Sequence, residues 1–209
     1  MPQDRLGAVW TVPAFLLMYG KAMQSMPHLH SLELYRVSVD RGLLRAICAL
    51  KQLTTLCLER CSFRLDEQEP SGMDARKFVS ALSPLRLKEF SLALSPNFER
   101  PLLSLLFRII NPRDLERLKI VHAWGVTEAI LSWIPENNVL KRLEIEAIKD
   151  VAVLLTALER CKCLEHLEVR QVDDIDPAVC DSLPALCLPL LRRVVSSSPV
   201  ILRLVRQVA

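Results

Sequence analysis

One pattern of hydrophobic positions, L-x-x-L-x-L, recurs along the chain. Its clearest copy is at residues 53–58, where L-T-T-L-C-L is followed by E-R-C. The last two leucines are two residues apart, so in a β-strand their side chains point to one face and their neighbours to the other. A strand with one apolar face cannot form a core alone, so the pattern predicts copies stacked side by side.

Seven copies of this pattern are present. They begin at Leu29, Leu53, Leu87, Leu115, Leu140, Leu164 and Leu191, and the last copy is degenerate because its sixth position is Ser196. Successive copies start 24, 34, 28, 25, 24 and 27 residues apart. A leucine-rich repeat runs about 20–29 residues and contains a strand and a helix or 3₁₀ turn. The spacing therefore predicts an α/β leucine-rich-repeat solenoid, a curved horseshoe with short parallel strands on its concave face and helices on its convex face.

We expect the repeats to occupy residues 29–209 and residues 1–28 to form a helical segment that caps or begins the array. Apolar residues at helical spacing predict helices at 41–50, 102–110, 126–134 and 151–160, and a last helix from Ser198. Asp150 is the expected N-cap of the fourth, and Ala129 is expected on the inward face of the third. The long second spacing predicts an acidic insertion near residues 64–72, either a solvated loop that begins at Phe63 or a second contact surface.

The composition suits a stacked aliphatic core, because 51% of the residues are hydrophobic and only 5% aromatic. A net charge of +3 is too small by itself to indicate nucleic-acid binding. The longest apolar run, residues 6–19, is shorter than the roughly 20 residues of a spanning helix. A secretory signal peptide is the alternative for this run, but Asp4 lies where basic residues are expected. We therefore expect neither a nucleic-acid nor a membrane partner.

The cysteine pattern indicates reduced thiols. The chain has seven cysteines, an odd number, and none lie in a C-x-x-C pair. This favours a cytoplasmic or nuclear protein. Cys161 and Cys163, with His166 nearby, raise the alternative of a metal site, but tetrahedral sites need four suitable ligands, so we expect no metal.

No motif in the sequence indicates catalysis. The phosphate-binding pattern G-x-x-x-x-G-K-[ST], the dinucleotide pattern G-x-G-x-x-G and the zinc-protease pattern H-E-x-x-H are all missing. His166 and Glu168 would share one strand face, but no nucleophile accompanies them, so a surface histidine is expected. The sequence predicts no enzyme activity, no catalytic residue and no cofactor.

In the predicted solenoid, the concave strand face is the surface available to a partner. Its charges are mildly acidic in the first three repeats, basic at Arg117, Lys119 and Arg142, and alternate in sign thereafter. Such a mosaic is common on ordinary solvated surfaces, but positioned charges also set binding specificity. Tyr35 is the best single anchor. The candidate partner-binding residues are Glu33, Tyr35, Glu59, Glu89, Arg117, Lys119, Arg142, Glu144, His166, Glu168 and Arg170.

The irregular L-x-x-L-x-L units, separated by long variable helical segments, resemble the repeat region of fungal F-box leucine-rich-repeat proteins from about residue 10 to the end. The resemblance implies a non-enzymatic scaffold whose repeats hold a substrate for a cullin-type ubiquitin ligase, with a Skp-type adaptor as a second partner. No L-P-x-E opening of an F-box precedes Leu29, so no adaptor-binding residue is carried over. The alternative is an enzyme inhibitor resembling ribonuclease-inhibitor repeats, which are more regular and have a strongly acidic concave face.

Overall fold

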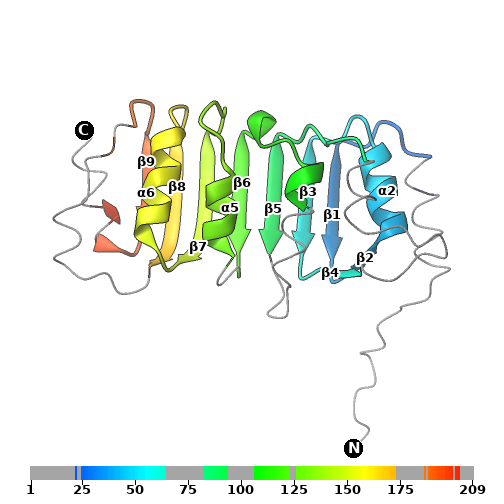
Figure 1. Cartoon of the computed structure of the whole chain (residues 1–209), viewed down its shortest axis with the longest axis horizontal. Helices are drawn as coiled ribbons and strands as arrows, with labels where there is room; N and C mark the ends of the chain where they lie inside the picture. Colours follow the sequence, from blue (N-terminus) through cyan, green and yellow to red (C-terminus); the bar gives the residue numbers. More distant parts are fainter. Residues whose placement is uncertain are drawn as a thin grey trace, which may run out of the picture.

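The computed structural model describes residues 22, 25–64, 82–93, 106–122, 126–172, 186, 188–199 and 201–202 of the chain. Its largest element is a seven-stranded, fully parallel β-sheet with strand order β1-β3-β5-β6-β7-β8-β9. The helices α2, α5 and α6 all lie on one face of this sheet (Figure 1). The strands are β1 (Ser31–Tyr35), β3 (Thr55–Glu59), β5 (Glu89–Ala93), β6 (Arg117–Val121), β7 (Arg142–Ile148), β8 (His166–Val172) and β9 (Arg193–Ser196).

The structure confirms the seven predicted parallel strands. Each strand begins two residues after the first leucine of its pattern, including the degenerate copy that starts at Leu191. Equivalent apolar positions pair across the sheet, so that Leu32 lies beside Leu56, and Leu56 beside Phe90. This row continues through buried residues of the later strands, namely Leu118, Leu143 and Leu167. The core is therefore one continuous aliphatic layer beneath the sheet, as the spacing requires.

One backbone hydrogen-bond arrangement recurs between neighbouring repeats. The carbonyl oxygen of His30 accepts hydrogen bonds from the N–H groups of Thr54 at 2.9 Å and Thr55 at 3.0 Å. The same double acceptance is repeated at the carbonyls of Thr54, Lys88, Glu116, Lys141 and Glu165. Because both N–H groups entering each strand of this sheet from β3 to β9 are satisfied by the previous repeat, the register is fixed at the start of these six strands.

The helices begin where short polar caps precede apolar residues. The N-cap of α2 (Arg41–Ala49) is Asp40, whose carboxylate accepts from the N–H of Leu43 at 2.7 Å. The N-cap of α6 (Val151–Arg160) is Asp150, which accepts from the N–H groups of Ala152 and Val153. These caps satisfy N–H groups that have no partner within a helix. The predicted helices at 41–50 and 151–160 are confirmed to within one residue.

The helix α5 (Thr127–Trp133) ends before Pro135, as predicted. Ala129 is exposed on it, so the prediction that Ala129 faces inward was wrong, because Val126, Ile130 and Leu131 already fill the buried side. Trp133 is half-buried and stacks on Phe107, with ring centroids 4.5 Å apart.

Two further local predictions need correction. Phe63 does not begin a loop: β4 (Ser62–Arg64) pairs in parallel with β2 (Ser38–Asp40) in a separate two-stranded sheet. Ile110 does not end a helix, since helical residues stop at Ile109 and Ile110 forms a parallel bridge with Leu85. Both segments satisfy backbone groups against the neighbouring repeat, a partnership that hydrophobic spacing does not reveal.

Several predictions fall outside the described residues. These are most of the helical segment at 1–28, the acidic insertion beyond Arg64, the first part of the helix at 102–110, and the last helix beyond Leu202. A 3₁₀ turn, η1 (Pro112–Asp114), follows the described part of the 102–110 segment. Among the described residues, no helix is both long enough and apolar enough to cross a membrane.

Candidate functional site

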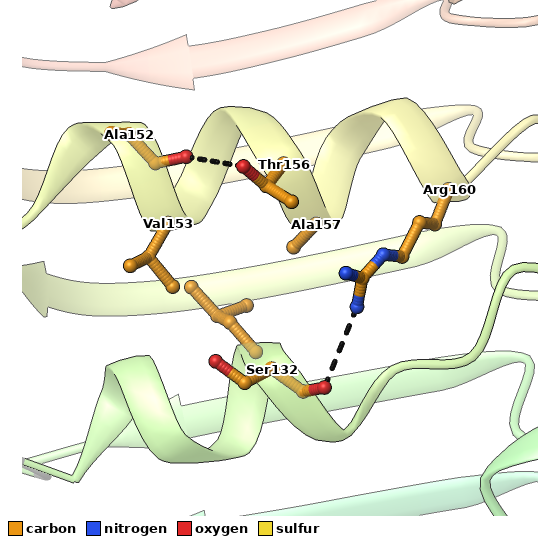
Figure 2. Close-up of a pocket in the computed structure, with 7 residues that line it drawn as sticks. Ser132, Ala152, Val153, Thr156, Ala157 and Arg160 are labelled. Atoms are coloured by element: carbon orange, nitrogen blue, oxygen red, sulfur yellow. Dashed lines mark hydrogen bonds between the residues drawn. The ribbon is translucent and has the colours of Figure 1, made fainter.

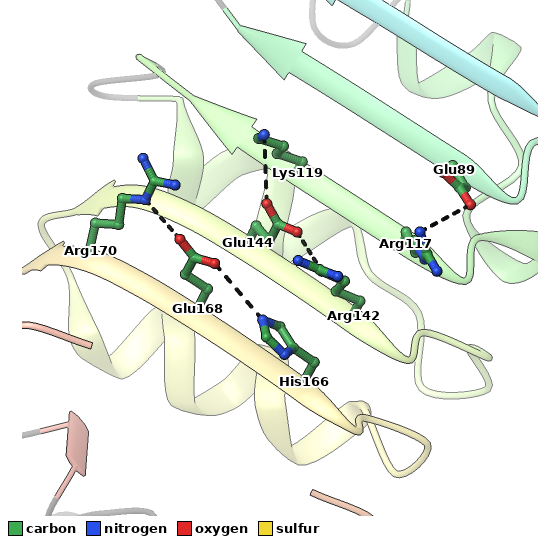
Figure 3. Close-up of polar contacts among 8 residues, drawn as sticks. All are labelled: Glu89, Arg117, Lys119, Arg142, Glu144, His166, Glu168 and Arg170. Atoms are coloured by element: carbon green, nitrogen blue, oxygen red, sulfur yellow. Dashed lines mark hydrogen bonds and ion pairs between the residues drawn. The ribbon is translucent and has the colours of Figure 1, made fainter. Parts of the chain in front are cut away.

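The face of the seven-stranded sheet opposite the helices carries the predicted partner-binding residues. We call it the open face. Alternation along each strand directs apolar side chains to the helix layer and their neighbours to the open face, and Figure 3 shows the charged side chains of four adjacent strands standing on it with the helices behind. Ala93, which alternation places on this face at the end of β5, is buried.

Strand register arranges these side chains in rows across the sheet. The first row runs Glu89, Arg117, Arg142, His166 and Arg193 on β5 to β9. The second row runs Ser91, Lys119, Glu144, Glu168 and Val195 on the same strands. Neighbouring parallel strands lie about 4.8 Å apart, so adjacent members of a row are within reach of one another.

Glu144 is held between two cations. Its carboxylate lies 3.7 Å from the ammonium of Lys119 on β6 and accepts a hydrogen bond from Arg142 on its own strand. The Glu144 side chain is only 17% exposed, whereas that of Lys119 is 47% exposed. The carboxylate is therefore recessed, and the cation above it meets the solvent.

Glu168 repeats this arrangement on the next strand. The Nε of Arg170 donates to its carboxylate at 2.8 Å, and this hydrogen bond is the main reason that the pKa of Glu168 lies below its ordinary value. Its side chain is 16% exposed, against 62% for Arg170. Both central carboxylates are thus largely covered, which the alternating pattern alone did not predict.

His166 is not the surface histidine expected from the sequence. Its side chain is only 12% exposed, and its Nε2 lies 3.9 Å from a Glu168 oxygen without making a hydrogen bond. Burial is the main cause that lowers the pKa of His166, and the guanidinium groups of Arg142 and Arg193 lower it further. The histidine is therefore neutral at pH 7, chiefly because it is buried.

Two ion-pair groups lie at the borders of the open face. The residues just before the strands form a ladder in which the Glu116 carboxylate lies 2.8 Å from Lys141 and 3.6 Å from Lys88. Its hydrogen bond to Lys141 is the main cause that lowers the pKa of Glu116. At the other end of the strands, Glu146 accepts a hydrogen bond from the backbone N–H of His122, and its carboxylate lies 2.9 Å from the ring Nδ1 of the same histidine. The sequence suggested neither group, because its residues are 24 or more positions apart and become neighbours only through the register.

The first strands carry the acidic part of the open face. Glu33 and Tyr35 are exposed on β1, and Glu59, beside Tyr35, is half-buried on β3. The guanidinium of Arg36 lies 5.0 Å from the centre of the Tyr35 ring, within cation–π range. Glu89 on β5 closes this acidic part and lies 3.4 Å from Arg117. The predicted site residues therefore do not form one cluster: they form an acidic end on β1 to β5 and a cation-rich end on β6 to β9.

Two depressions lie on the part of the surface that the structure describes. One lies on the open face between Lys119, Glu144, Glu168 and Arg170, with a volume of about 10 Å³, enough for about one water molecule. A larger groove of about 190 Å³ lies between α5 and α6, on the helix side (Figure 2). There, Arg160 donates to the carbonyls of Ser132 and Ile134 at the end of α5, so its charge serves helix packing.

The described residues contain no group of three or more His, Cys, Asp or Glu side chains that could hold a metal ion. Cys161 is fully buried and Cys163 half-buried.

Comparison with known proteins does not assign the chain to a family. No family model matches it, and no curated protein is significantly similar to it.

Proposed function

We propose that this chain is a non-enzymatic scaffold that binds a protein partner through its open face. One observation carries the proposal: the open face presents exposed cations above recessed carboxylates that hold them in place, as Lys119 lies above Glu144 and Arg170 beside Glu168. Side chains fixed by such pairs lose little additional freedom when a partner binds, which favours affinity and specificity. The helices α2, α5 and α6 all lie on the opposite face of the sheet (Figure 1).

The repeating units support a more specific description of the scaffold. We take them to be leucine-rich repeats in a curved solenoid, with the open face as the concave side. The spacing of the strands, their parallel order and the repeated double acceptance by carbonyls such as that of His30 all favour stacked equivalent units. The buried Cys61, whose thiol donates to the carbonyl of Leu34 in the preceding unit, occupies the position where such repeats carry Asn or Cys.

The substrate-binding part of an F-box-type ubiquitin-ligase adaptor would be one form of this function. Recovery of a Skp-type adaptor and a cullin with the intact protein would support it. The inhibitor alternative gains no support from the described open face, because its β6 to β9 end is rich in cations rather than acidic.

Site-specific photo-crosslinking tests the proposed function. p-Benzoylphenylalanine would replace Val195, which is exposed on the open face, or Ala152, which is exposed on α6. After irradiation in an extract of the source cells, crosslinked proteins would be identified by mass spectrometry. We expect a defined protein to crosslink through position 195 and not through position 152. The same set of proteins crosslinking at both positions would contradict an open-face binding site.

A further inference from the structure

Three arginines lie in one line across the cation-rich end of the open face. Arg117 on β6 is beside Arg142 on β7, and Arg193 on β9 is separated from Arg142 only by His166 on β8. We call Arg117, Arg142 and Arg193 the arginine row. With strands about 4.8 Å apart, the row spans roughly 14 Å, about the length of four residues of an extended chain.

The arginine row is more positive than the rest of the open face. On β6 to β9, the first and second rows of the open face together contain four cations, namely the arginine row and Lys119. The same two rows contain only two carboxylates, those of Glu144 and Glu168. Arg117 and Arg193 are exposed at the two ends of the row, and Arg193 makes no ion pair with another described residue.

The pairing pattern leaves the arginine row able to accept a further carboxylate. Glu144 and Glu168 lie in the second row, two residues further along their strands, and are occupied by Arg142 and Lys119 and by Arg170. A guanidinium has five N–H donors in a planar fork, so an arginine with one partner can still bind another carboxylate.

From this placement we infer that the arginine row binds an extended acidic segment of a protein, which crosses β6 to β9 with carboxylate side chains over Arg117 and Arg193. The inference rests on the proposed function and names the chemistry of its partner. The acidic residues Glu33, Glu59 and Glu89 at the other end of the sheet would repel such a segment, so it would be confined to the cation-rich end.

The same surface is poorly suited to a nucleic acid. Among the described residues, no Phe, Tyr or Trp lies on the open face of β6 to β9, so bases would find no stacking platform. Glu144 and Glu168 would also lie beneath a continuous phosphate backbone and repel it. Separate carboxylates on a peptide can instead avoid the second row.

Fluorescence anisotropy with defined peptides tests the inference on the full chain. The probes are labelled 12-residue peptides of alternating Glu and Ser, Gln and Ser, or Lys and Ser, and a 12-nucleotide oligothymidylate. The protein variants are Arg117→Gln with Arg193→Gln, and the matched control Lys51→Gln with Lys162→Gln, which removes two exposed cations from turns outside the open face. Both double variants have the same net charge.

We expect the Glu peptide to bind, the Gln and Lys peptides not to bind, and added salt to weaken the complex. Affinity for the Glu peptide should fall about tenfold or more in the arginine variant and remain unchanged in the control. Equal loss in both variants, no binding of the Glu peptide, or tighter binding of the oligothymidylate would overturn the inference. If position 195 still crosslinks a protein in that event, the proposed function stands and only the acidic partner is excluded.

Discussion

The thiol of Cys61 donates a hydrogen bond to the backbone carbonyl of Leu34, with 3.3 Å between sulfur and oxygen. The two residues are 27 positions apart and belong to consecutive repeats. Cys61 is buried, and burial is the main cause that raises the pKa of its thiol. The thiol therefore stays protonated and acts as a donor that joins one repeat to the preceding one.

Removing this donor should destabilise the fold. Cys61→Ala takes away a buried sulfur and leaves the Leu34 carbonyl without that partner, so we expect the free energy of unfolding to fall by about 1–2 kcal/mol. Urea unfolding followed by circular dichroism measures this, and the slope with denaturant should not change. Cys57→Ala is the control, because Cys57 is half-buried on the open face. An equal loss in both variants would contradict a specific role for Cys61.

The strands were predictable from the sequence because their signal is local. The leucines at the start of each copy fix a strand two residues later, even at Leu191, where the sixth position is Ser196. Asp150 likewise defines the first residue of α6 through its own side chain. The sequence is sufficient for such features, because the position of a strand and the N-cap of a helix depend on residues only a few positions away.

The state of the candidate site was not predictable in the same way. Its residues and their side of the sheet follow from alternation, but the recessed carboxylate of Glu144 depends on Lys119, which is 25 positions earlier and becomes a neighbour only through the register. Alternation predicts an exposed His166, yet its side chain is only 12% exposed between its register neighbours Arg142 and Arg193. To predict cross-strand contacts of this kind, one must first know how repeats of unequal length align with one another.

A buried asparagine joins the loop after α5 to the end of α6. The Nδ2 of Asn138 donates to the carbonyls of Pro135 at 2.7 Å and Arg160 at 3.0 Å, and its Oδ1 accepts from the N–H of Leu140 at 3.1 Å. Asn138→Ala leaves all three backbone groups without this partner, so we expect a loss of about 2–4 kcal/mol. Asn138→Asp should be at least as harmful, because a carboxylate cannot donate to the two carbonyls.

Urea unfolding measures these losses, with Asn137→Ala as the control. Asn137 is exposed next to the buried asparagine, and its replacement should change stability by no more than about 0.5 kcal/mol. If Asn138→Ala were as mild as the control, ordered water would have to replace the lost bonds.

The thiols should differ widely in reactivity. Burial raises the pKa of Cys48 and of Cys161 to about 11, so at pH 8 only on the order of one in a thousand of either would be thiolate, the reactive form. Among the five cysteines that the structure describes, we expect iodoacetamide to modify half-buried Cys163 and Cys57 first. Cys48 and Cys161 should react only as the chain opens, and at least about 100-fold more slowly. Timed digestion and mass spectrometry would follow each site, and modification of Cys161 as fast as Cys163 would contradict the described packing.

Stability should fall as the pH is lowered, in two separate windows. His166 has a pKa lowered from 6.5, chiefly by burial and then by Arg142 and Arg193, against opposing effects of Glu144 and Glu168. Below about pH 6.5, the unfolded chain therefore takes up a proton that the folded chain does not, and the folded state loses stability. Glu168, whose pKa is lowered from 4.5 chiefly by its bond to Arg170, adds a second loss below pH 4.5.

The variant His166→Gln separates the two windows. The variant removes the histidine that takes up a proton near pH 6.5 in the unfolded chain. Stability should therefore decline less between pH 7 and 5 than in the unmodified protein, while the loss below pH 4.5 remains. Arg193→Gln should flatten the first window partly, because one of the two charges that lower the pKa of His166 is gone. Urea unfolding at half-unit pH intervals measures both slopes. If His166→Gln left the slope of stability against pH unchanged between pH 7 and 5, His166 would not be the buried, neutral side chain described between Arg142 and Arg193.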